Sequence, residues 1–202
     1  KYYGAFVWDQ QEGSWRNDFK YEYAYNQFGH QSLFARYQWD MDANDWFCSY
    51  KYEYDSNQTG RRTMYAYYAY DKNAQLLKGR TKYEKDYDSL QVLIERRDFA
   101  WDSVLADWHP YLETYYYYDS AGLKIESLTM GWQADQAEWE KHSRNLFSYN
   151  ENRQALKEQV FSWSINLGDW IDSIKHESLY DSIGREVLFI TSLWDIQTSS
   201  WK

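Results

Sequence analysis

Histidine and carboxylate side chains are the residues in this chain whose chemistry could support catalysis or metal binding. The four histidines, His30, His109, His142 and His176, show no spacing of the His-Glu-x-x-His kind that places two imidazoles on one metal ion. Neither a Gly-x-Ser-x-Gly elbow nor a Cys/His pairing is present. With 31 acidic residues, any single pair of carboxylates is uninformative. We therefore expect surface histidines, no catalytic residue and no cofactor.

One oxygen-rich segment has residue types that could hold Ca²⁺. It consists of Asp40, Asp42, Asn44 and Asp45. Segment 103–107, which stands at the equivalent place in the repeat described below, lacks this pattern. The sequence therefore favours a polar turn, with Asp40 as its first residue, over a calcium site.

The overall charge and the single cysteine narrow the classes of partner. A net charge of -9 opposes nonspecific attraction to nucleic acid and to anionic lipid surfaces. No apolar run reaches the roughly 20 residues that span a bilayer, so membrane insertion is not expected. Cys48 has no partner for an intrachain disulfide.

The tryptophans reveal an internal repeat of 31 residues with no insertion or deletion. They fall into two series that are seven residues apart, and Tyr70 and Leu77 fill the one gap in each series. The first series is Trp8, Trp39, Trp101, Trp132, Trp163 and Trp194, and the second is Trp15, Trp46, Trp108, Trp139, Trp170 and Trp201. Residues 1–202 therefore make one array of about six and a half units. We expect it to be a fragment of a longer array, because no capping repeat is visible.

Within a unit, residue types alternate with period two, which is typical of β-strands. In segment 15–25 the aromatic residues are predicted to lie on one face, with Lys20 and Glu22 on the other. The strand ends in Asn/Asp-x-x-Gly, for example from Asn26 to Gly29. This pattern favours a type I turn followed by a left-handed glycine, the common three-residue hairpin loop.

The register of the hairpins can be predicted from these turns. If Asn26 pairs with His30, then Tyr25 pairs with Gln31, and an unbroken ladder places Tyr21 opposite Ala35 and Phe19 opposite Tyr37. The second turn, from residue 40 to residue 45, places Trp39 opposite Trp46. We therefore predict that the two tryptophans of every repeat meet across a hairpin, on the same face as the tyrosines. The opposite face is expected to be mixed and to carry the Lys and Glu rows with Phe34, Ile94, Ile125, Leu156 and Val187.

The predicted fold class is all-β. About thirteen strands should form a continuous antiparallel meander of two-strand repeats, and a sheet of this width is expected to curl or become superhelical. A parallel β-solenoid with one coil per repeat is the alternative. Aromatic residues make up 21% of the chain, so apolar burial must be largely aromatic burial. The sequence favours the tryptophan series as core, with a ligand-binding platform as the alternative role.

The motif Tyr-x-Tyr-Asp-x-x-Gly, complete from Tyr116 to Gly122, resembles the YD (Rhs-type) repeats of bacterial surface and secreted proteins. The Trp-Asp-x5-Trp spacing looks more like the aromatic hairpin repeats of uncharacterised secreted proteins of Bacteroidetes. The chain differs from Rhs repeats in its longer period and its tryptophan series. The resemblance implies a bacterial scaffold located outside the cytoplasm, and it assigns no functional residues.

Taken together, these patterns predict a noncatalytic repeat module, extracellular or on the cell surface, that binds protein or glycan along an extended face. A glycan platform built from the Trp and Tyr series is the first alternative. The second alternative is an enzyme whose site breaks the repeat in region 70–110, where Tyr70 and Leu77 replace tryptophan and Pro110 enters a strand.

Overall fold

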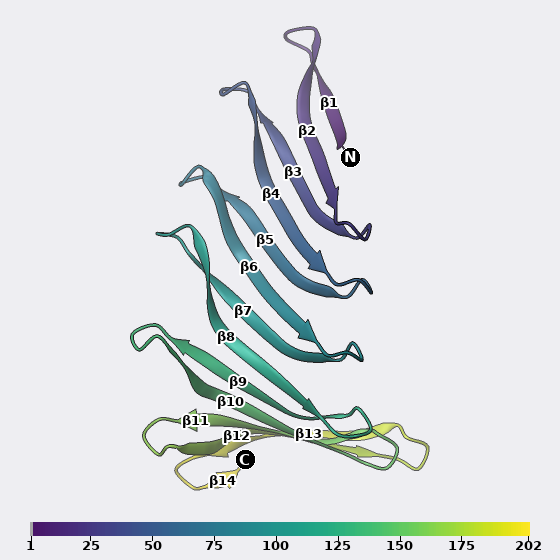
Figure 1. The fold of residues 1–202 in the computed structure, drawn as a ribbon, viewed down its shortest axis with the longest axis vertical. Coiled ribbons are helices and arrows are strands. Elements are labelled where there is room, and N and C mark those ends of the chain that lie inside the picture. The colour runs from purple at the N-terminus through teal and green to yellow at the C-terminus, as the bar shows by residue number, and fades with distance from the viewer. Residues whose placement is uncertain (1) are drawn as a thin grey trace. The chain divides into compact units, whose positions relative to one another are not determined.

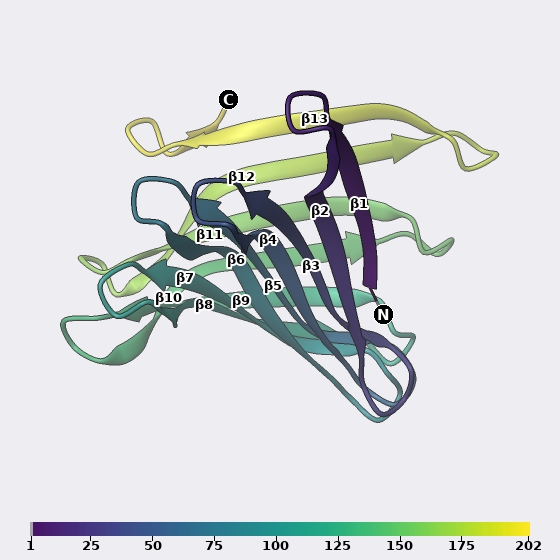
Figure 2. The ribbon, with the colours of Figure 1, turned by 90° about the horizontal axis from the view of Figure 1, so that it is seen from above.

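The computed structural model describes residues 2–202 and contains strands and turns, with no helix in the part of the chain that it describes. Fourteen strands form one open antiparallel sheet in sequence order, from β1 to β14 (Figures 1 and 2). The strands are β1 (Tyr2–Asp9), β2 (Ser14–Tyr25), β3 (Gln31–Asp40), β4 (Asp45–Ser56), β5 (Arg62–Asp71), β6 (Leu76–Tyr87), β7 (Leu93–Asp102), β8 (Asp107–Tyr118), β9 (Lys124–Gln133), β10 (Glu138–Tyr149), β11 (Ala155–Ser164), β12 (Asp169–Tyr180), β13 (Glu186–Asp195) and β14 (Ser200–Trp201). The all-β meander is confirmed, and the antiparallel pairing excludes the β-solenoid. The strand beyond the predicted thirteen is the two-residue β14.

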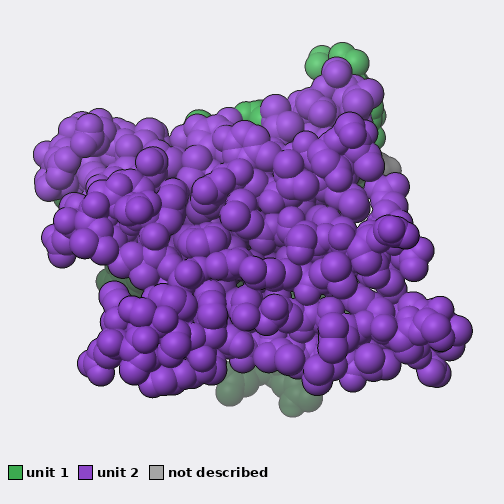
Figure 3. All heavy atoms as spheres, turned by 90° about the horizontal axis from the view of Figure 1, so that it is seen from below, with its two compact units in different colours: residues 1–86, 97–111 green, residues 87–96, 112–202 purple. Residues whose placement is uncertain are grey.

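The strands group into two compact units. One unit comprises residues 1–86 and 97–111, and the other comprises residues 87–96 and 112–202 (Figure 3). The division falls within β6, at its last residue, and within β7 and β8.

The three-residue hairpin loops have the predicted geometry. The N–H of Asn26 donates to the carbonyl of His30 at 2.8 Å, and the N–H of Gly29 donates to the carbonyl of Asn26 at 3.0 Å. Gly29 has φ +81°, in the left-handed region where glycine carries no steric cost. At the equivalent position of two other repeats, Gln91 and Arg153 adopt φ +65° and +64°.

The predicted register is correct at the turns and wrong inside the strands. Tyr25 pairs with Gln31 as expected, but a bulge follows, so that Tyr21 pairs with Arg36 and Phe19 with Gln38. A bulge places two residues opposite one and shifts the remaining ladder by a residue. One such bulge occurs in each pairing from β1–β2 to β5–β6 and from β8–β9 to β12–β13.

A second bulge separates the tryptophans from the tyrosines. In the β1–β2 hairpin, Trp15 pairs with Trp8, and Phe19 pairs with Ala5 after the unpaired residue Asp18. Paired residues point to the same side of a sheet, whereas residues three apart in an unbroken strand point to opposite sides. Because Ala5 lies three residues before Trp8, Phe19 and the tyrosines that alternate with it lie on the face opposite Trp15.

The prediction of one aromatic face is therefore wrong. We call the side that carries the Trp8–Trp15 pair and its equivalents the tryptophan face. The Lys and Glu rows lie on this same face, as the position of Lys20 Nζ above the rings of Tyr37 and Trp46 shows. The opposite side, with Tyr21, Tyr23 and their equivalents, is the tyrosine face. Phe34 pairs with Tyr23 and Tyr52 and so belongs to the tyrosine face.

Three of the aliphatic residues predicted for the mixed face are extra residues of bulges. Ile125, Leu156 and Val187 are skipped in the pairing of β9, β11 and β13, respectively. They do not occupy a regular ladder position.

The sheet has no covering layer within either unit, so burial is limited. Ala35 and Ala66, each 1% exposed, are the buried hydrophobic residues, and no large side chain in the described part of the chain is fully buried. The aromatic residues therefore form partly exposed ladders on the sheet instead of the closed core that their number suggested.

Candidate functional site

The tryptophan pairs are the most regular feature of the chain. The rings of Trp39 and Trp46 lie 5.2 Å apart at an interplanar angle of 75°, the edge-to-face geometry that aromatic pairs prefer. The same contact, at 5.1 to 5.5 Å, forms in all six pairs: Trp8–Trp15, Trp39–Trp46, Trp101–Trp108, Trp132–Trp139, Trp163–Trp170 and Trp194–Trp201. The predicted meeting of each pair across a hairpin is confirmed. Each contact joins the two strands of a hairpin next to its four-residue loop. We therefore assign the tryptophan pairs a structural role, which is to close the hairpins.

Lysine side chains lie over aromatic rings on the tryptophan face. Lys51 Nζ is 4.4 Å from the ring centre of Tyr68, and Lys82 Nζ is 4.1 Å from that of Phe99. The same two ammonium groups form ion pairs with Glu53 and Glu84, two residues further along their strands. An exposed cation–π contact contributes about 0.5–1 kcal/mol, so these rows cover ring faces and stabilise the sheet surface.

The tyrosine face of the first unit carries a ladder of ring contacts from β1 to β6, several of them stacked. Near-parallel contacts join Tyr3 to Tyr21, Tyr21 to Phe34, and Tyr52 to Tyr67, with centroid distances of 6.3, 5.5 and 4.8 Å. In the second unit some of the equivalent places hold polar residues, such as Ser127 and Ser178, which are 8% and 9% exposed, whereas Tyr116 and Phe147 remain aromatic. The repeat folds in both cases, so the ladder is a property of the first unit and not a requirement of the fold.

Most of the four-residue loops are organised by the aspartate that directly precedes them, namely Asp9, Asp40, Asp71, Asp102 and Asp195, whereas Gln133 and Ser164 stand at the other two. Asp9 Oδ1 accepts hydrogen bonds from the N–H groups of Gln11 and Glu12, at 2.9 and 3.2 Å. These two bonds are the main reason why the pKa of Asp9 is lowered, and the nearby Arg16 guanidinium adds to the effect. The sequence identified such aspartates as turn residues, and the structure gives them this role.

In several hairpins a basic residue directly after the position of the second tryptophan reaches the same aspartate. Lys78 Nζ lies 2.9 Å from Asp71 Oδ2, and His109 Nε2 lies 3.4 Å from Asp102 Oδ2. The hydrogen bond from Lys78, with those from the N–H groups of Ala74 and Asn73, lowers the pKa of Asp71 to about 2. These contacts link the two ends of the four-residue loop.

In the segment considered for calcium, the carboxylates of Asp40 and Asp45 accept hydrogen bonds from backbone N–H groups of the turn. Asp40 Oδ1 accepts the N–H groups of Asp42 and Ala43, at 2.9 and 3.0 Å, and Asp45 Oδ1 accepts the N–H of Trp46 at 2.7 Å. Across the described residues, no three His, Cys, Asp or Glu side chains gather in a way that could hold a metal ion.

The histidines lie in separate surroundings. His30 packs against Gly60 of the next three-residue loop, whereas His176 stacks on Phe189 at 5.5 Å and bonds to Thr191 Oγ1 at 3.0 Å. His142 is the bulge residue of β10, and His109 belongs to the loop contact described above.

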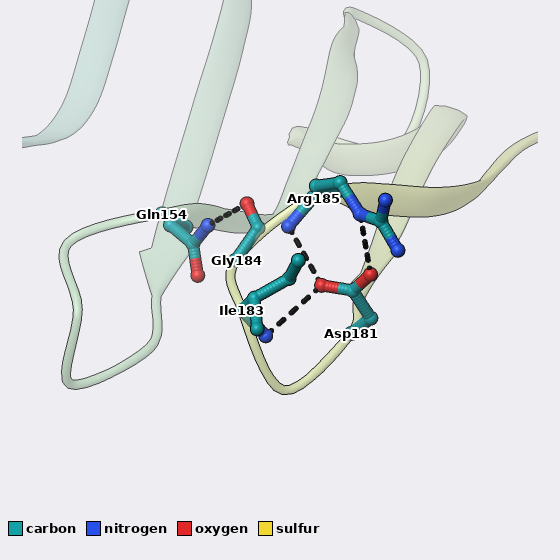
Figure 4. A network of polar contacts seen from close by, with 5 residues as sticks. All are labelled: Gln154, Asp181, Ile183, Gly184 and Arg185. Carbon is teal, nitrogen blue, oxygen red and sulfur yellow. Dashed lines mark hydrogen bonds and ion pairs between the residues drawn. The ribbon is translucent and has the colours of Figure 1, made fainter.

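Successive three-residue loops are linked by side chains. Gln154 Nε2 donates to the carbonyl of Gly184 at 2.7 Å, in the loop one repeat further along (Figure 4). Within that loop, Asp181 accepts bonds from the N–H groups of Ile183 and Arg185 and pairs with the Arg185 guanidinium at 2.8 Å (Figure 4). The turn residues therefore couple neighbouring repeats as well as reverse the chain.

In region 70–110, tight packing accompanies the loss of the two tryptophans at Tyr70 and Leu77. A side chain at Gly79 would overlap the rings of Trp101 and Trp108. Trp108 Nε1 donates to the hydroxyl of Tyr68 at 2.9 Å. The two tryptophans of the next hairpin, Trp101 and Trp108, therefore pack directly onto β6. This strand belongs to the hairpin in which Tyr70 and Leu77 stand in place of tryptophan.

A cleft opens between the first two four-residue loops, with a volume of about 280 Å³. Its lining includes Trp15 and Trp39 from the two tryptophan series. Phe6, Glu12 and Asn17 also line it, and none of the three was predicted from the sequence. No motif marks these three residues, which all belong to the β1–β2 hairpin, and they meet Trp39 only because adjacent hairpin ends lie side by side.

No protein-family model matches the chain, and no curated protein is similar to it in sequence. Among solved structures, it is similar to a DUF3836 family protein from Bacteroides vulgatus, with 14% identity over 54% of this chain and 94% of that one and a TM-score of 0.40. A DUF3836 family protein from Parabacteroides distasonis shows 22% identity over 44% of this chain and 81% of that one, with a TM-score of 0.36. The TcdB2-TccC3 structure without its hypervariable C-terminal region shows 16% identity over 84% of this chain and 9% of that one, with a TM-score of 0.42. At these TM-scores the similarities assign no family and no function.

Proposed function

We propose that this chain is a noncatalytic binding module that presents an extended aromatic sheet to a partner. The supporting observation is the exposure of both sheet faces within each unit, with no large side chain fully buried in the described residues. Soluble proteins rarely leave large contiguous apolar surfaces exposed unless they use them for binding. Several aromatic residues keep much of their surface in solvent, among them Trp15 at 67% and Tyr3 at 64%.

Two kinds of partner fit such a surface, a protein and a glycan. Aromatic rings offer apolar faces to both. On the tyrosine face, however, stacked neighbours such as Tyr52 and Tyr67 turn much of their ring faces toward each other. The rings of the first hairpin, Trp8 at 48% and Trp15 at 67% exposure, keep more free surface, which favours these two tryptophans as the place for a glycan.

The contacts of Gly79, Asp102 and His109 in region 70–110 favour a structural role over the enzyme alternative. Gly79, Trp101 and Trp108 form a packed cluster, and the side chains of His109 and Asp102 are 47% and 33% exposed. The Asp102 carboxylate accepts the N–H groups of Leu105 and Val104, which lower its pKa and give it a structural role in the loop. We therefore include the absence of catalysis in the proposal.

The location outside the cytoplasm is also part of the proposal, and it rests on the Tyr-x-Tyr-Asp-x-x-Gly and Trp-Asp-x5-Trp patterns. The described residues contain no helix long and apolar enough to cross a membrane. Exposure of the protein to antibody and protease on intact cells of the source organism would test the location. Full protection on intact cells, with digestion after lysis, would contradict it.

The binding function is tested by presenting the purified protein to immobilised glycans and by incubating it with every glycan that it retains. We expect retention without any change in the glycan, as judged by chromatography. Release of shortened or modified products would show an enzyme and overturn the proposal. If no glycan is retained, we expect binding to an isolated surface protein with a measurable Kd, and failure of both would also overturn the proposal.

A further inference from the structure

The cleft between the first two four-residue loops differs from the same place in other repeats. It lies where the end of the β1–β2 hairpin meets the end of the β3–β4 hairpin, and its volume is about 280 Å³. Aromatic walls come from Phe6, Trp15 and Trp39, and polar groups come from Glu12, Asn17 and Asn44. The cleft therefore combines apolar ring surface with hydrogen-bonding groups, as small-molecule sites do.

At three corresponding places, a side chain or a ring fills this space. One repeat further on, Phe47 replaces Arg16, and its ring packs 4.9 Å from Tyr70. At Gly79, the counterpart of Asn17, the ring of Trp101 occupies the place where a side chain would lie. Lys141, another counterpart of Asn17, has its Nζ 4.2 Å from the ring centre of Trp163. The open cleft is therefore not a general consequence of the repeat.

The charged side chains of the cleft indicate whether its ligand is neutral or acidic. Asp9 is engaged by two loop N–H groups and by the Arg16 guanidinium at 3.5 Å, so these two charges largely offset each other. Arg16 also contacts Met41 Sδ on the second hairpin and so is held beside the cleft. This leaves the carboxylate of Glu12 with the amides of Asn17 and Asn44. A carboxylate and two amides can accept and donate hydrogen bonds to hydroxyl groups, and the carboxylate repels a second carboxylate.

We propose that this cleft binds one neutral pyranose ring, held against Trp15 and Trp39, with its hydroxyl groups bonded to Glu12, Asn17 and Asn44. The apolar faces of a pyranose match the aromatic walls, and its hydroxyl groups match the polar ones. Acidic sugars such as uronic acids are disfavoured by Glu12. This inference rests on the proposed binding function and adds to it a ligand class and a location.

The test uses the whole chain and a set of methyl pyranosides (glucoside, galactoside, mannoside and glucuronide) in titration calorimetry and saturation-transfer NMR. We expect millimolar binding of at least one neutral pyranoside and at least tenfold weaker binding of the glucuronide. Trp15→Ala and Asn17→Ala should each weaken binding of the neutral ligand by at least tenfold. Trp15 is 67% exposed, so its replacement is expected to leave the fold intact.

Two further variants make the test specific. Trp170→Ala removes the matching ring of a distant hairpin and should leave the affinity unchanged. Glu12→Gln should bring the affinity for the glucuronide closer to that for the glucoside. Equal binding by the Trp15 and Trp170 variants, or no binding of any pyranoside, would overturn the assignment of the cleft. If the protein still binds a polysaccharide or a protein while these variants behave alike, the cleft assignment fails and the broader binding function stands.

Discussion

Gly79 is the position where a single added methyl group is expected to disturb the packing of a whole hairpin. A Cβ at this position would overlap ring atoms of both Trp101 and Trp108, well inside van der Waals contact. Inserting atoms into a packed site costs about 1–3 kcal/mol. Replacing glycine by alanine in a strand otherwise gains about 0.5–1 kcal/mol. We therefore expect Gly79→Ala to lower the free energy of unfolding by about 1–2 kcal/mol.

Gly131→Ala provides the matched control. Gly131 is also a buried strand glycine, but a Cβ there would lie 3.7 Å from His142, which is ordinary contact. We expect this variant to be neutral or stabilised by about 0.5–1 kcal/mol. Denaturant unfolding of both variants measures the difference. The indole N–H resonance of Trp108, which donates to Tyr68, reports whether the ring has moved in Gly79→Ala. Equal stability of the two variants, with this resonance unshifted, would refute the packing argument.

Three other changes have defined outcomes. Ala137 has φ +54°, a conformation that costs a non-glycine residue about 1 kcal/mol, so Ala137→Gly should raise the melting temperature. Ala74→Gly, in an equivalent loop but without a positive φ, should lower it, and the same sign for both variants would contradict the argument. The pKa of Asp71 is lowered to about 2 from an ordinary 3.8, so its contribution to stability is present above about pH 4 and is lost as the pH falls toward 2. The difference in melting temperature between the protein and Asp71→Asn should therefore be largest above pH 4 and should vanish near pH 2, and a constant difference would oppose this assignment. Trp132→Ala, in β9 of the second unit, should cost about 2 kcal/mol, because the ring is partly exposed and a full core deletion costs about 3–5 kcal/mol. Trp201→Ala, on the two-residue β14, should cost less, and calorimetry of the two variants compares them.

Local patterns predicted the hairpins because each hairpin depends on residues close in sequence. Asn26 and Gly29 define a loop whose hydrogen bonds span five residues, and the structure has those bonds. Trp39 and Trp46 meet because the loop between them fixes their pairing. The repeat also showed that the same contact should occur six times, and it does.

The face on which each residue lies could not be read from alternation. One unpaired residue, Asp18 in β2, reverses the side of every residue that follows it. Bulge residues such as Asp18 and Leu156 share no residue type, so the sequence does not reveal where a bulge lies. The period-two pattern of residue types continues across them without a visible break. For this reason the tyrosines were assigned to the face of the tryptophans, and Phe34 to the wrong side.

The candidate cleft depends on tertiary structure in the same way. The sequence determined the repeat, the turns, the tryptophan pairs and the acidic, aromatic character of the chain. Only the folded sheet decided that Glu12 and Asn17 of one hairpin lie beside Trp39 of the next, and that Phe47 closes the following junction. Contacts between hairpin ends depend on the side chains of two repeats at once and on the bulges that set their faces, so no pattern within a single repeat contains them.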